Sequence, residues 1–147
     1  MPRVIILLAT AFLLMASGGQ QPTKKGPAPL VGQAELPLYP SVAWGLGISG
    51  RVIIAMEVDD SGASKVRVKA STNRFLTAPT LNNAQSWRFQ RGMPGSFDVT
   101  YTYKIQGGAT DLPESPKVVL DLPYAVTVIA HPFKPTRFDD PAGRVVH

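Results

Sequence analysis

Few side chains in this chain have the types and spacing that catalysis or metal binding requires. There is no cysteine, which excludes disulfides, thiol catalysis and a cysteine-ligated metal. His131 and His147 lie far apart with no carboxylate at ligand spacing, and Asp59–Gly62 lacks the later ligands of a calcium loop and is read as a turn. Gly45–Gly50 matches a dinucleotide-binding fingerprint, but it ends a short helix and opens a strand, which is the wrong context. We therefore expect no metal, no cofactor and no enzymatic activity.

Composition indicates one folded domain with irregular ends. The chain has 147 residues, of which 44% are hydrophobic, and this suits a single compact core. Most of its 14 prolines lie before Val42 or after Glu114. The formal net charge is +5, but no more than two basic residues are consecutive, so a solvated basic face is a better interpretation than a nucleic-acid site.

The N-terminal residues 1–18 have the pattern of a signal peptide. Arg3 supplies a positive charge, Val4–Ala16 is almost uninterrupted apolar sequence, and Ala16-Ser17-Gly18 offers small residues before a cut at Gly19. An uncleaved membrane anchor is the alternative, and it is less favoured because a bilayer span needs about 20 apolar residues. We expect a periplasmic or secreted protein, with inner-membrane anchoring as the weaker interpretation.

Residues 19–38 contain several prolines and no periodic apolar face, which predicts an extended, solvated linker. After it, Tyr39-Pro40 and Ser41 favour a helix of one or two turns, which Gly45 and Gly47 keep short.

Two strands and a tight turn follow over Gly50–Ala70. The first strand has apolar residues at every second position (Val52, Ile54, Met56 and Val58), and the second alternates Lys65, Arg67 and Lys69 with apolar residues. Asp60-Ser61-Gly62 interrupts the alternation. This pattern predicts a β-hairpin with one buried face.

The rest of the chain predicts a short amphipathic helix over Thr80–Phe89, capped near Thr77-Ala78-Pro79, and a third strand from Phe97 to Ile105. The expected fold is α+β: a three-stranded antiparallel sheet with two short helices on one face. In the C-terminal extension 107–147, Val118–Ala130 predicts one or two further strands around Pro123. Because this segment is too apolar to remain in water, we expect it to extend the sheet or cover its apolar face.

The order helix, strand, strand, helix, strand, together with the residues at its joints, resembles the TonB C-terminal domain family over residues 39–106. The residues that carry the resemblance are Tyr39, Pro40, Ala43, Gly50, Gly62, Trp87, Arg88 and Phe89. One departure follows the second strand, where the family commonly has Ser-Ser-Gly and this chain has Ser71-Thr72-Asn73.

The resemblance implies recognition of an extended peptide from an outer-membrane receptor, which adds as a strand to the exposed edge of the last strand. The matching edge here is Asp98, Val99, Thr100, Tyr101, Thr102, Tyr103 and Lys104. The same polar residues also suit an edge that is blunted against aggregation. If the strands of the extension pair with this edge, they occupy the position that the family uses for its partner.

We therefore expect an exported, non-catalytic protein- or peptide-binding module of the cell envelope. One alternative is a TonB-type energy transducer with an uncleaved anchor, and another is a structural envelope protein whose sheet is completed by its own tail. No nucleic-acid or metal partner is expected. Sheet edges of this kind can also pair two copies of the chain as a homodimer.

Overall fold

The computed structural model describes residues 27–110 and 114–134. The predicted signal peptide and the chain after Lys134 lie outside the described residues. In chain order the elements are β1 (Val31–Gln33), α1 (Ser41–Gly45), β2 (Gly50–Val58), β3 (Ser64–Ser71), α2 (Arg74–Gln85), β4 (Arg88–Phe89), β5 (Gly95–Ile105), β6 (Lys117–Asp121) and β7 (Ala125–Ala130).

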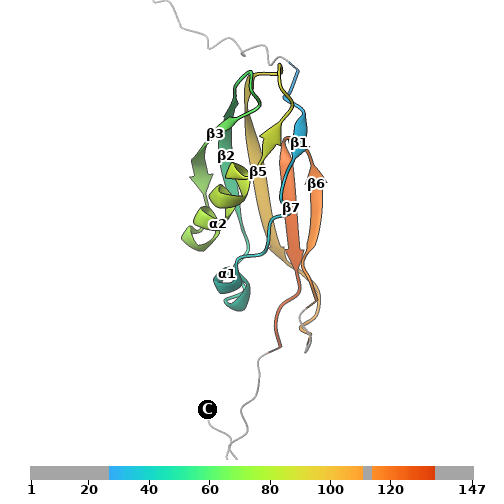
Figure 1. Cartoon of the computed structure of the whole chain (residues 1–147). Coiled ribbons are helices and arrows are strands. Elements are labelled where there is room, and N and C mark those ends of the chain that lie inside the picture. The colour runs from blue at the N-terminus through green and yellow to red at the C-terminus, as the bar shows by residue number, and fades with distance from the viewer. Residues whose placement is uncertain (1–26, 111–113, 135–147) are drawn as a thin grey trace, which may run out of the picture.

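The main element is an open five-stranded sheet in the order β3-β2-β5-β7-β6 (Figure 1). The predicted three-stranded antiparallel sheet is present as the β3-β2-β5 half of it. The extension supplies two more strands, as expected, but β7 runs parallel to β5 and the sheet is therefore mixed. Parallel pairing was not predicted, because period-2 alternation gives no strand direction.

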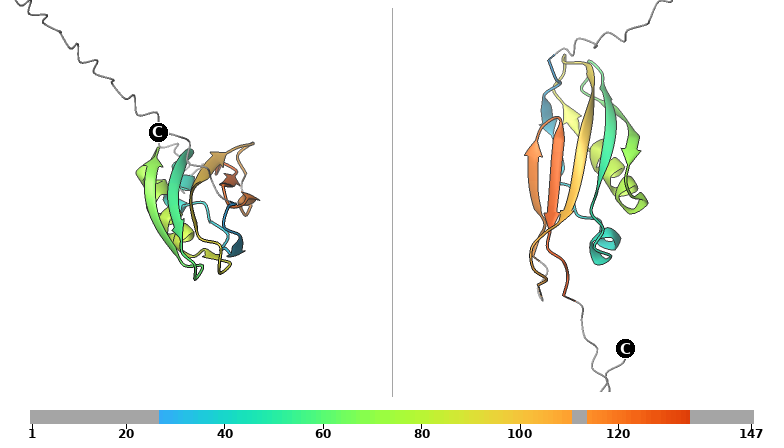
Figure 2. Two further views of the ribbon diagram at one scale, coloured as in Figure 1. Left: turned by 90° about the horizontal axis from the view of Figure 1, so that it is seen from above. Right: turned by 180° about the vertical axis from the view of Figure 1, so that it is seen from behind.

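The helices and a small second sheet lie on one face of the large sheet (Figure 2). The second sheet pairs β1 with β4 antiparallel, with Val31 opposite Phe89. Part of the predicted solvated linker is therefore folded: Val31–Gln33 forms a strand, and Pro29 and Pro37 are buried. In residues 27–110 and 114–134, no helix lies on the other face of the large sheet.

The second helix begins earlier than predicted and ends before Trp87. It spans Arg74–Gln85 because Asn73 caps it, with its Oδ1 accepting a hydrogen bond from the Phe75 N–H at 2.9 Å. The exposed Pro79 is accommodated inside the helix instead of starting it. The prediction of two short helices is thus wrong for α2, and Arg88–Phe89, predicted as helical, forms β4.

Alternate residues of β2 and β5 form the core under α2, together with Trp87, which is buried as expected of a core anchor. The side chain of Asn83 in α2 is hydrogen-bonded to three other residues. Its Oδ1 accepts from Tyr101 Oη at 2.9 Å and from Trp87 Nε1 at 3.4 Å, and its Nδ2 donates to the Glu35 carbonyl at 2.9 Å. The Tyr103 hydroxyl lies 2.8 Å from Thr80 Oγ1. Burial raises the pKa of Tyr101 and Tyr103, so both phenols stay protonated as hydrogen-bonding groups.

The β2–β3 hairpin closes through a turn that Asp59 stabilises. Its Oδ1 accepts from the Ser61 hydroxyl at 2.6 Å, from the Ser61 N–H at 2.9 Å and from the Ala63 N–H at 3.1 Å. The Ser61 hydrogen bond lowers the pKa of this carboxyl. The carboxylate is thus used inside the turn, in agreement with its interpretation as a turn residue.

Gly62 and Gly92 provide a matched test of how this turn packs on β4. Both have positive φ, +83° and +78°, so alanine at either should lose about 1 kcal/mol of stability through backbone strain. A Cβ at Gly62 would also collide with the Phe89 carbonyl oxygen, whereas a Cβ at Gly92 meets open space. In chemical denaturation, Gly62→Ala should therefore lower the free energy of unfolding by about 1–3 kcal/mol more than Gly92→Ala does. Equal losses would contradict this packing.

Candidate protein-binding edge

The predicted binding residues Asp98–Lys104 lie inside the sheet, in its middle strand. One side of β5 pairs with β2 from Gly95 to Tyr103. The other side pairs with β7 from Thr100 to Ile105, between the Thr100 N–H donating to the Tyr124 carbonyl at 2.8 Å and the Gln106 N–H donating to the Ala130 carbonyl at 2.9 Å. The structure therefore places the chain's own strand where an added partner strand was expected.

The side chains of the predicted edge divide between the two faces of the sheet. Val99, Tyr101 and Tyr103 are buried in the core. Asp98, Thr100, Thr102 and Lys104 are the alternate set and belong to the face that carries no helix. On that face, Lys69 Nζ of β3 reaches across β2 to Asp98 Oδ2 of β5 at 2.6 Å and forms an exposed ion pair.

Strand β7 is a full member of the core. Val126, Val128 and Ala130 are each at most 1% exposed, and they stand in register with Tyr101, Tyr103 and Ile105 of β5. Removing an aliphatic side chain of this size from water contributes about 1.5–3 kcal/mol. The pairing of β5 with β7 of the same chain is therefore stabilised by side-chain burial as well as by backbone hydrogen bonds.

The sheet ends at β3 on one side and at β6 on the other. Strand β3 carries the exposed side chains of Lys65, Arg67 and Lys69 at every second position. A row of lysine and arginine side chains is a common means of protecting an edge strand from pairing. The β3 edge is therefore poorly suited to a further strand.

Strand β6 lies at the opposite edge of the sheet (Figure 1) and has no such row of basic side chains. Its central Val119 and Leu120 are 46% and 42% exposed, it contains no proline, and its charges stand only at its two ends, Lys117 and Asp121. Tyr124, in the turn to β7, is also partly exposed and lies edge-on to Phe97. An apolar strand with one unpaired backbone edge is a template for strand addition.

The sequence pattern predicts this strand but not its place at the edge of the sheet. The alternation of Val118, Leu120 and Leu122 marks a strand. Its edge position depends on which strand pairs with β5, and this is not encoded locally. The contrast between the apolar middle of β6 and the basic row on β3 was the sequence feature that could have indicated β6 as the binding edge.

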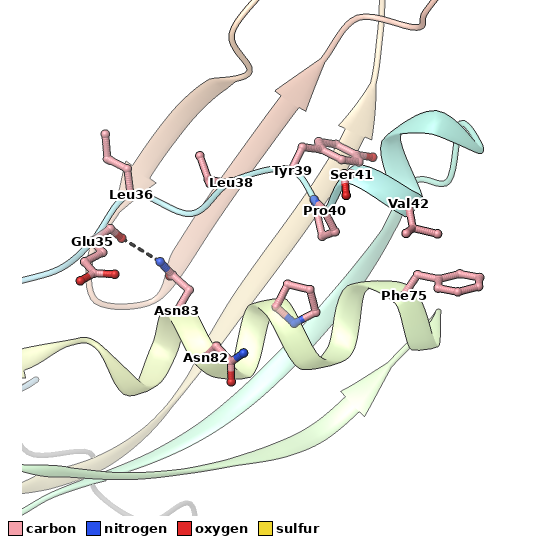
Figure 3. A pocket seen from close by; sticks show the side chains of 11 residues that line it. Glu35, Leu36, Leu38, Tyr39, Pro40, Ser41, Val42, Phe75, Asn82 and Asn83 are labelled. Carbon is pink, nitrogen blue, oxygen red and sulfur yellow. Dashed lines mark hydrogen bonds between the residues drawn. The ribbon is translucent and has the colours of Figure 1, made fainter.

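A second surface is an open groove of about 580 Å³ between α2 and the segment before α1 (Figure 3). It is lined by Glu35, Leu36, Leu38, Tyr39, Pro40, Ser41, Val42, Phe75, Pro79, Asn82 and Asn83. The hydrogen bond from Asn83 to the Glu35 carbonyl joins its two walls (Figure 3). Among residues 27–110 and 114–134, no cluster of three His, Asp or Glu side chains has metal-binding geometry.

The residues that carried the family resemblance lie at packing positions. Tyr39, Ala43, Trp87 and Phe89 are buried, and the Tyr39 hydroxyl donates to the Ile48 carbonyl at 2.7 Å. Gly50 lies where a Cβ would collide with Thr72 and Leu76. Arg88 folds back on the chain and donates to the Gln85 and Trp87 carbonyls, both at 2.9 Å. These contacts join α1, α2 and the hairpin.

The described residues form a small α+β module whose open five-stranded sheet has β3 and β6 at its edges. Residues 35–106 match the family model of the Gram-negative bacterial TonB protein C-terminal region, and this part of the chain is a TonB C-terminal domain. TonB C-terminal domains are periplasmic, non-catalytic energy-transducer modules. The strands β6 and β7 lie beyond the matched residues. No curated protein matches this chain.

Of the helices in the described parts of the chain, neither is long and apolar enough to span a bilayer.

The pairing of β5 on both sides makes a prediction for amide hydrogen exchange in the ligand-free protein. The Thr100 amide donates to β7, and the alternation of a parallel ladder directs the Thr102 amide the same way. Both amides should exchange slowly without any peptide, because they open only when the core opens. Half of the amides on the edge strands β3 and β6 should exchange fast in the same spectra. Fast exchange at Thr100 and Thr102 would contradict the pairing with β7.

Proposed function

We propose that this protein is an exported, non-catalytic module of the cell envelope that binds an extended segment of another protein by strand addition at β6. The main support is the contrast between the two edges. The middle of β6 is apolar and no strand among the described residues pairs with its outer side, whereas the β3 edge bears a row of basic side chains. The TonB C-terminal domain supports a protein partner and excludes catalysis.

Strand addition at β6 would combine two sources of recognition. Backbone hydrogen bonds to the free side of Lys117–Asp121 supply affinity for any extended chain. Selectivity comes from side chains, because alternate residues of the added strand would cover Val119 on one face and Leu120 on the other. A segment with apolar residues in its middle and a charge at each end fits this edge best.

The edge of β5 is a poorer place for the partner. A segment could reach Thr100–Ile105 only after β7 leaves, which exposes the fully buried Val126 and Val128. At about 1.5–3 kcal/mol for each side chain, this cost exceeds what a few added strand contacts return. We therefore place the partner two strands further out, at β6.

The family implies a segment of an outer-membrane receptor as the partner. The match to TonB also favours a second candidate function, that of an energy transducer, which needs a tether to the inner membrane. The two functions separate at residues 1–18, where cleavage releases the module and retention anchors it.

A titration with short synthetic peptides of alternating valine and threonine tests strand addition. We expect shift changes and slower amide exchange in β6, with little change in β3. Val119→Lys should weaken binding at least about tenfold, because a charge would enter the middle of the added ladder. Ala70→Lys, on the exposed part of β3, is the matched control and should bind as the unchanged protein does. Binding that Val119→Lys leaves intact would refute the β6 site.

The N-terminal mass of the protein recovered from fractionated cells separates the two candidate functions. A released module should begin at Gly19 and occur in the soluble envelope fraction. A chain that keeps Val4–Ala16 and sediments with membranes would exclude the released module and support the transducer.

A further inference from the structure

We propose that a second copy of this chain is a partner for the β6 edge, paired with it antiparallel in a register centred on Val119. This inference rests on the proposed function, because it requires that β6 accepts an added strand. The result is one continuous sheet that runs through both copies.

The charges within β6 itself favour this pairing. The strand reads Lys117-Val118-Val119-Leu120-Asp121. A two-fold axis through Val119 places Lys117 opposite Asp121 of the second copy, and Asp121 opposite its Lys117. Directly opposed charges of unlike sign stabilise a strand pair, whereas a parallel in-register pair would oppose lysine to lysine. The strand is therefore self-complementary in the antiparallel direction only.

Such pairing also covers apolar surface at the edge. Val119 would lie across from Val119 of the second copy, and Leu120 across from its Val118. Val118 is partly buried against the core, while Val119 and Leu120 are nearly half exposed. Pairing thus removes from water the exposed apolar side chains in the middle of the edge.

The fold leaves room for this arrangement. Helix α2 packs on β2 and β3, at the opposite side of the sheet from β6 (Figure 1). A two-fold axis perpendicular to the sheet keeps the helices of both copies on one face. Because α2 lies far from β6 in each copy, the two α2 helices do not meet across the new strand pair.

The other self-pairings are less favourable. Two β3 edges would bring Lys65, Arg67 and Lys69 against the same basic row. A β3 edge on a β6 edge is a head-to-tail contact, which leaves a free edge at each end and would build open filaments. When β6 of one copy pairs with β6 of another, both apolar edges are covered, and the assembly is a closed dimer.

The predicted dimer is weak. A pair of five-residue strands buries less than the roughly 1,600 Å² of a standard protein interface. We therefore expect a reversible dimer whose population rises with protein concentration.

Analytical ultracentrifugation of charge variants over a concentration series tests the register. Lys117→Asp opposes two acidic residues and Asp121→Lys opposes two basic ones, so each variant alone should raise the dimer dissociation constant roughly tenfold. A mixture of the two should associate again, since every opposed pair in the mixed dimer then has unlike charges. The double variant Lys117→Asp with Asp121→Lys should also recover the dimer. Arg67→Asp, the same charge change on β3, is the control and should leave it unchanged.

The outcomes separate this inference from the proposed function. A chain that stays monomeric while its β6 amides respond to the valine–threonine peptides would overturn the dimer and leave strand addition standing. A chain that neither dimerises nor binds peptide at β6 would overturn both. A dimer that the single variants do not weaken, or that the mixture does not restore, would contradict the antiparallel register.

Discussion

The whole structure depends on the pairing of β5 on both of its sides. Its buried residues, Phe97, Val99, Tyr101 and Tyr103, connect the hairpin on one side to β7 on the other. Tyr101 and Tyr103 also hold α2, through their hydrogen bonds with Asn83 and Thr80. Because β7 contributes its own buried valines to this core, the C-terminal strands are an integral part of the domain's packing.

This arrangement changes where the module can meet a partner. In a three-stranded sheet of the TonB C-terminal type, the last strand is an open edge. Here β7 of the same chain occupies that position, and the edge strand on this side of the sheet is β6. A strand with an apolar middle and opposite charges at its ends suits both an extended segment of another protein and a second copy of the chain. The physical basis of recognition, backbone pairing at a sheet edge, is the same.

The parts that could be predicted from the sequence are those that local patterns encode. Alternation identified β2, β3 and β5, and the joint residues Gly62 and Trp87 indicated the family. The start of α2 was missed because Asn73 caps the helix a turn before the expected Thr77-Ala78-Pro79. The pairing of Val31 with Phe89, and of β7 with β5, joins segments far apart in sequence. Such contacts depend on which apolar faces remain uncovered after the hairpin and α2 have packed, and no local pattern records this.

Backbone NOEs between β5 and β7 in the ligand-free protein test most directly whether the chain fills its own β5 edge. Isotope-filtered spectra of mixed labelled and unlabelled protein separate contacts within one chain from contacts between copies. We expect intramolecular NOEs of a parallel pair, in the register from Thr100 opposite Ala125 to Ile105 opposite Ala130. Absence of these NOEs, or their appearance only between copies, would show that β7 does not pair with β5 of its own chain.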